Sequence, residues 1–116
     1  MSSEKIIELC SADEVVEDEI LQATLPSGHQ LAIYNVKGNY YATDDTCTHG
    51  KVSLSEDGVI EGAQVECTWH FGRFEIETGK PCGMPCTVPL RTWEIEVKDG
   101  KIWVDLSQHP DTSTNE

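Results

Sequence analysis

The chain has 116 residues, which favours one domain and excludes a multidomain enzyme. With 21 acidic and 8 basic side chains, its formal net charge is -13, so nucleic acid and anionic membranes are poor partners and a basic protein is a better one. No apolar run approaches the roughly 18 residues of a membrane helix, and residues 1–5 do not resemble a secretory signal. We therefore expect a cytoplasmic protein.

Short strands separated by turn signals are predicted along the first part of the chain. Residues 5–9 form a plausible first strand, and Ser11 followed by Glu14 has the spacing of a helix start, which predicts one helical turn through about Asp18. Strands are then expected over residues 20–25 and 30–36, because apolar residues alternate there in part and Pro26-Ser27-Gly28 favours a turn between them.

Two tight hairpins are predicted around Lys37-Gly38 and Asp99-Gly100, because glycine adopts the positive φ that two-residue turns require. Near the second hairpin, alternation predicts an antiparallel pair whose inward residues are Trp93, Ile95, Val97, Ile102 and Val104. Further strands are expected over residues 64–67 and 74–77. The pattern is all-β and typical of a small sandwich or barrel.

The informative constellation is Cys47-Thr48-His49, followed further along by Cys67-Thr68-Trp69-His70. Each segment offers one thiolate and one imidazole, and such a donor set can hold one tetrahedral zinc ion or one small iron–sulfur cluster. Structural zinc sites usually pair like ligands on one segment, whereas each segment here carries one of each kind. That distribution favours a binuclear cluster in which one iron takes both cysteines and the other takes both histidines.

These residues resemble the Rieske 2Fe-2S motif, in which Cys47-x-His49-Gly50 is followed by Cys67-x-x-His70-x-Gly72. The order of segments is similar to that of the Rieske-type ferredoxins of bacterial aromatic ring-hydroxylating dioxygenase systems. The resemblance implies a Rieske-like small antiparallel β sandwich with two cluster-binding loops. It also implies that Cys47, His49, Cys67 and His70 hold one Rieske-type 2Fe-2S cluster.

Histidine ligation has a physical consequence for such a cluster. Two neutral imidazoles replace two anionic thiolates, so adding an electron costs less, and the potential rises to roughly -150 to +300 mV from about -400 mV for plant-type ferredoxins. The net charge of -13 acts in the opposite direction. High-potential members of the family carry an extra cysteine in each ligand loop, and residues 50–52 and 71–73 contain none. We expect a potential at the low end of that range.

The remaining cysteines and histidines have simpler interpretations. Cys10 is expected to end the first strand as a small apolar residue. Cys82 and Cys86 are interpreted as structural thiols, although a pairing or a second site stays open; between them, the resemblance makes Pro85 a lid residue over the cluster. His29 and His109 are expected to be solvated and not ligands.

The aromatic and acidic residues are assigned in the same way. The residues expected in the core are Phe74, Tyr40, Trp93 and Trp103, whereas Trp69 is equally consistent with packing and with a place near the electron exit. The acidic run over residues 13–19 is interpreted as a solvated face.

The resemblance implies a soluble one-electron carrier that does no bond chemistry itself. Its donor would be a flavoprotein ferredoxin reductase and its acceptor a terminal Rieske non-haem iron dioxygenase, and we expect a monomer. Residues 1–106 would form the Rieske domain and residues 107–116 a flexible tail. The alternatives are a zinc-stabilised binding module and a small Rieske-like subunit of a nitrite-reductase-type enzyme.

Overall fold

The computed structural model describes residues 6–26, 28–46, 53–67, 72–82 and 89–106. Over these residues the chain is built from antiparallel strands, which confirms the all-β prediction. The strands are β1 (Ile6–Ser11), β2 (Ile20–Thr24), β3 (Gln30–Val36), β4 (Asn39–Asp44), β5 (Gly58–Glu61), β6 (Gln64–Cys67), β7 (Gly72–Glu75), β8 (Thr92–Trp93), β9 (Ile95–Lys98) and β10 (Lys101–Asp105). A 3-10 helix spans Ala12–Glu14, and a short helix α1 spans Leu54–Asp57.

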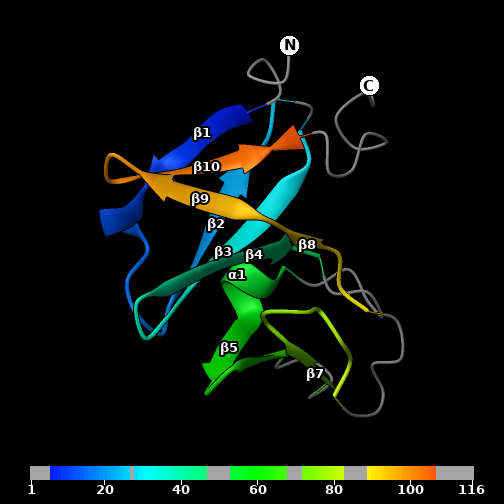
Figure 1. Ribbon diagram of the computed structural model, residues 1–116. Coiled ribbons are helices and arrows are strands. Elements are labelled where there is room, and N and C mark those ends of the chain that lie inside the picture. The colour runs from blue at the N-terminus through cyan, green and yellow to red at the C-terminus, as the bar shows by residue number, and fades with distance from the viewer. Residues whose placement is uncertain (1–5, 27, 47–52, 68–71, 83–88, 107–116) are drawn as a thin grey trace.

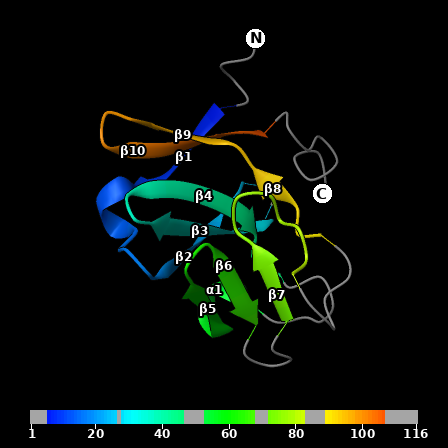
Figure 2. The ribbon, with the colours of Figure 1, turned by 60° about the horizontal axis from the view of Figure 1, so that its bottom comes forward.

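The strands form three sheets, with the orders β1-β10-β9, β2-β3-β4-β8 and β5-β6-β7. In Figures 1 and 2 the β1-β10-β9 sheet lies at the top, the four-stranded sheet in the middle, and the β5-β6-β7 sheet with α1 at the bottom. The β1-β10-β9 sheet joins the two ends of the described chain, because β1 pairs along β10.

Strand β3 lies at the centre of the packing because both of its faces are buried. Leu31 and Ile33 belong to the core shared with the β1-β10-β9 sheet, which includes Ile102 and Val104. Ala32 and Tyr34 belong to a second core, which includes Leu54, Val65, Cys67 and Phe74. Successive side chains of a strand point to opposite faces, so this one strand contributes to two cores.

Both predicted hairpins are confirmed, and their turn residues show why they form. Lys37 and Gly38 have φ values of 54° and 87°, and Asp99 and Gly100 have values of 56° and 75°. Two successive positive φ values match the right-handed twist of the flanking strands. The first hairpin is further supported by Asn35, whose Oδ1 accepts a hydrogen bond from the Gly38 N–H at 2.9 Å.

Several details differ from the predictions. The helical turn ends at Glu14, and the Ser11 side chain makes no capping hydrogen bond. Val97 is 47% exposed although the alternation predicts it inward, and Trp103 is only half-buried although it is predicted in the core. Val97 lies on the edge strand β9, and Trp103 alternates along β10 with Ile102 and Val104, so it lies on the face of the sheet opposite their core. None of the described helices is long and apolar enough to cross a membrane.

Candidate metal centre

Of the four predicted ligands, Cys67 lies within the described residues. Cys47, His49 and His70 lie outside them, as do Trp69, Pro85, Cys86 and His109. The structure therefore places Cys67 directly and places the residues that flank the other ligand positions. The contacts of those flanking residues show how the ends of each ligand segment are held in the fold.

Cys67 is the last residue of β6 and is fully buried. It pairs with Gly58 on β5 and with Gly72 on β7, so the two residues that flank segment 68–71 lie opposite each other across a strand pair. Its thiol is free of any disulfide, as a metal ligand requires. The expected core position of Phe74 is confirmed, since it lies fully buried in the same core.

The ends of segment 47–52 are also held together. Thr46 and Ser53 form an antiparallel bridge, and the Leu54 N–H donates to the Asp45 carbonyl oxygen at 2.7 Å. This contact starts helix α1 directly after the segment. The residues on either side of the segment that carries Cys47 and His49 therefore lie next to each other.

The Asp45 carboxylate strengthens this closure. It is 1% exposed and accepts hydrogen bonds from Gln22 Nε2 at 2.9 Å, Ser53 Oγ at 2.6 Å and the Ser55 N–H at 2.8 Å. The Ser55 contact caps helix α1 from outside the helix, which is useful because Ser53 makes no side-chain cap of its own. One side chain thus joins strand β2, the end of β4 and the start of α1.

The preceding residue, Asp44, makes a separate set of contacts. Its Oδ1 atom lies 2.8 Å from His29 Nε2 and accepts a hydrogen bond from Trp93 Nε1 at 2.9 Å, and its Oδ2 atom lies 3.9 Å from Arg91 Nε. The expectation of a solvated His29 is therefore wrong, because its ring is half-buried against Asp44 and Trp93. No local signal in the sequence reveals this contact, which joins positions far apart in the chain.

The segment 83–88 is also flanked by anchored residues. The Cys82 N–H donates to the Arg73 carbonyl oxygen at 2.8 Å, and the Leu90 N–H donates to the Gly79 carbonyl oxygen at 2.8 Å. Cys82 itself is exposed and free, in agreement with a thiol that has no disulfide partner among the described residues. Gly79 has a φ of 77°, and a Cβ built there would lie 2.1 Å from the Leu90 carbonyl oxygen, so glycine is required for this approach.

Residues close to three of the undescribed internal segments belong to one core. Leu54 follows segment 47–52, Cys67 precedes segment 68–71, and Leu90 follows segment 83–88. The two segments with predicted ligands and the segment with the predicted lid residue therefore start from the same packed end of the molecule. This is the arrangement that a metal centre shared by separate loops needs.

The chemistry of the donors agrees with this geometry. The described residues alone contain no group of three His, Cys, Asp or Glu side chains that could hold a metal. Cys67 would supply one soft thiolate, and Cys47, His49 and His70 would complete a set suited to an iron–sulfur cluster or to zinc.

Cys10 behaves differently from the predicted ligands. Burial, followed by the nearby charges of Glu14 and Glu8, raises the pKa of the Cys10 thiol to about 11. It packs at the margin of the core shared by β1 and β10, in agreement with its expected role as a small apolar residue. The thiol form is inert, so this cysteine is not a candidate ligand.

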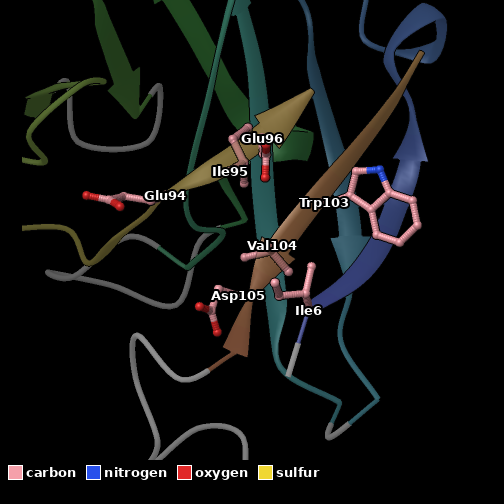
Figure 3. A pocket seen from close by; sticks show the side chains of 7 residues that line it. All are labelled: Ile6, Glu94, Ile95, Glu96, Trp103, Val104 and Asp105. Carbon is pink, nitrogen blue, oxygen red and sulfur yellow. The ribbon is translucent and has the colours of Figure 1, made fainter. Parts of the chain in front are cut away.

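A hollow of about 370 Å³ lies on a different part of the molecule, over strands β1, β9 and β10. Figure 3 shows its lining, in which the carboxylates of Glu94 and Asp105 lie on one side and the Trp103 ring on the other, with Ile95, Glu96 and Val104 between them. Besides these carboxylates, its described lining contains no hydroxyl, thiol or imidazole.

Comparison with known proteins decides between the two kinds of metal centre. Residues 5–94 match the model of the Rieske 2Fe-2S domain. The chain belongs to the Rieske 2Fe-2S family. This membership confirms the prediction of a Rieske-type 2Fe-2S cluster as the cofactor.

Ferredoxins are among the proteins that this chain resembles in sequence and in fold. The chain is 57% identical, over 105 residues, to the ferredoxin component of the p-cumate 2,3-dioxygenase system of Pseudomonas putida, covering 90% of this chain and 89% of the relative. The solved ferredoxin of Sphingomonas yanoikuyae B1 is 34% identical with a TM-score of 0.81, covering 85% of this chain and 96% of that one.

A third comparison concerns a solved complex. The chain is 41% identical, with a TM-score of 0.81, to a chain in the complex of reduced oxygenase and oxidized ferredoxin of carbazole 1,9a-dioxygenase, covering 88% of this chain and 94% of that chain. These likenesses confirm the predicted Rieske-like fold and the resemblance to ferredoxin components of dioxygenase systems.

Proposed function

We propose that this chain is a one-electron carrier that passes electrons to the terminal Rieske non-haem iron oxygenase of an aromatic-ring dioxygenase system. The observation that carries the proposal is the 57% identity, over nearly the whole chain, to the ferredoxin component of such a system. The chain itself does no bond chemistry and acts as the electron-transfer component.

The ligands proposed for the 2Fe-2S cluster are Cys47, His49, Cys67 and His70. Support comes from Cys67, which is buried and free at the end of β6, and from the anchored flanks of segments 47–52 and 68–71. When bound, the cluster supplies one reversible electron. The four proposed ligands would hold the cluster beside the core that contains Cys67, Leu54 and Phe74, and the charges of the protein would tune its potential.

The proposal also covers the electron donor, the cellular location, the oligomeric state and the domain bounds. The donor is a flavoprotein ferredoxin reductase, in keeping with the multicomponent systems to which the relatives belong. The protein acts in the cytoplasm as a monomer, and residues 1–106 form the Rieske domain. The expected tail, residues 107–116, lies outside the residues that the structure describes. Docking to each partner is weak, because a shuttle must leave one partner before it meets the next.

The experiment is a reconstitution with the reductase and terminal oxygenase of the p-cumate system, in which this chain replaces the native ferredoxin. Oxidation of the aromatic substrate should require the chain and should stop with Cys67→Ser. Cys10→Ser is the matched control, since it removes a half-buried thiol outside the proposed site. If the cluster-loaded chain accepts no electrons from the reductase, the proposed donor is wrong; if it delivers none to the oxygenase, the proposed acceptor is wrong.

The alternatives of a zinc-stabilised module and a nitrite-reductase-type subunit predict different results. A zinc protein is colourless and has no redox transition. A nitrite-reductase subunit would act with a different catalytic chain and would not restore aromatic oxidation.

A further inference from the structure

Two consecutive aspartates at the end of β4 have contrasting surroundings. Asp44 lies against His29 and Arg91, which carry or can carry positive charge. Asp45 is contacted by neutral groups, namely the Gln22 amide, the Ser53 hydroxyl and the Ser55 N–H. Among the residues that the structure describes, no Lys, Arg or His forms an ion pair with Asp45.

The partners of Asp45 suit its ionised form. The Ser55 N–H can only donate, and the Gln22 contact is made through its NH2 group, so both carboxylate oxygens accept. Asp45 is 1% exposed, whereas exposed charges are screened by water and salt. Asp45 thus places a buried negative charge at the end of the molecule that carries the predicted ligands.

Asp45 also lies next to the segment that carries two of the proposed ligands. Asp45 precedes the proposed ligand Cys47 by one intervening residue, and its hydrogen bonds cross to Ser53 and Ser55 on the far side of segment 47–52. Gln22 ties the same carboxylate to strand β2 of the central sheet. The side chain therefore joins both ends of the segment that carries Cys47 and His49 to a rigid support.

We propose that Asp45 is a positioning residue for the cluster, which fixes both ends of this segment and lowers the reduction potential by its charge. The proposal rests on the proposed function and on the ligand set given above. Reduction adds one electron to the cluster, and a nearby negative charge in a poorly screened region makes that addition less favourable. The same carboxylate should slow the loss of iron, because separation of Ser53 and Ser55 from Asp45 would leave their hydrogen-bond donors unpaired.

The test of the charge effect is a redox titration of the cluster-loaded chain, followed by visible absorption and electron paramagnetic resonance. Asp45→Asn keeps the size of the side chain and removes its charge, so the midpoint potential should rise. Glu56→Gln is the matched control, because it makes the same charge change at an exposed position on helix α1, and its shift should be much smaller. An Asp45→Asn protein with an intact cluster and a midpoint no higher than that of Glu56→Gln would overturn the charge effect.

The effect of Asp45 on the two ends of segment 47–52 is measured separately, as the rate at which a chelator removes iron from the oxidised protein. Ser53→Ala keeps the charge and removes the 2.6 Å hydrogen bond to Asp45, so iron should be lost several-fold faster than from wild type or Glu56→Gln. If Ser53→Ala loses iron at the wild-type rate, Asp45 does not fix the ends of this segment.

Gln22→Met covers the case in which Asp45→Asn does not fold. It keeps the carboxylate charge and removes a donor, so the midpoint should stay at or below the wild-type value; a rise would contradict the proposal. A wild-type chain without any 2Fe-2S cluster would defeat the proposed function itself. A normal wild-type cluster with unresponsive variants would defeat the Asp45 role alone.

Discussion

The β3-β4 hairpin of the central sheet and the β5-β6-β7 sheet differ in the length of their strands. Strands β3 and β4 have seven and six residues and are joined by a two-residue turn, so neighbouring segments of the sequence pair directly. Strands β5, β6 and β7 have four residues each, and the last two flank segment 68–71. Short strands gain less from pairing, so we expect this end to depend more on Asp45, on the shared core and on the proposed cluster.

The largest expected effect comes from removing the cluster. Cys67→Ser should abolish cluster binding and should strongly reduce amide hydrogen-exchange protection at Val65 and Phe74, while Ile33 and Tyr34 on β3 remain protected. Cys10→Ser should leave both regions unchanged, since Cys10 lies at the margin of the other core. Equal loss of protection in β3 and β6 after Cys67→Ser would remove the distinction between the two regions.

A smaller effect is expected from the apolar core beneath the site. Phe74 is fully buried, so Phe74→Ala should cost about 3–5 kcal/mol of unfolding free energy, measured by denaturant titration of the cluster-loaded chain. Val97 is 47% exposed, so Val97→Ala should change the stability by about 0.5 kcal/mol or less. Similar costs for the two variants would contradict the assignment of the core.

Gly38 and Gly79 both have positive φ, but they differ in the space around them. Gly38→Ala and Gly79→Ala both force a side chain into positive φ, which costs about 1–2 kcal/mol. At Gly38 nothing lies within 4 Å of the added Cβ, whereas at Gly79 the Leu90 carbonyl oxygen lies at 2.1 Å. Gly79→Ala should therefore be the more destabilising variant in thermal unfolding. If Gly38→Ala has the larger cost, the close approach between Gly79 and Leu90 is wrong.

The smallest effect is expected at an ion pair on the β1-β10-β9 sheet. Lys101 Nζ lies 3.7 Å from Glu8 Oε2, and both side chains are more than two-fifths exposed. Such a pair contributes little because water and salt screen it, so Lys101→Ala should lower stability by less than about 0.5 kcal/mol. A loss of several times that amount, measured in the same denaturant titration, would show that this sheet relies on charge pairs.

The sequence predicts the fold well where the signals are local. The turns Lys37-Gly38 and Asp99-Gly100 need only glycine and its neighbour, and β3 coincides with the predicted residues 30–36. Helix α1 and strand β5 were not predicted, because α1 begins through the contact of Ser55 with the distant Asp45. The half-buried His29 was missed for the same reason, since its partner Asp44 lies on another strand.

In the candidate site, too, some features follow from local sequence and others depend on tertiary contacts. The spacing of Cys47, His49, Cys67 and His70 predicts the ligand types without any structure, because that prediction depends only on which donors each segment carries. The supporting contacts of Asp45 with Gln22 and Ser53 depend on how β2, β4 and α1 pack, which no local pattern records. The supports of the site therefore had to be found in the fold.

The most direct test of the central claim is the content of iron, zinc and acid-labile sulfide per chain in anaerobically purified protein. A Rieske-type cluster predicts about two iron atoms and about two sulfides per chain, with no stoichiometric zinc. One zinc per chain without sulfide would contradict the assignment of an electron carrier.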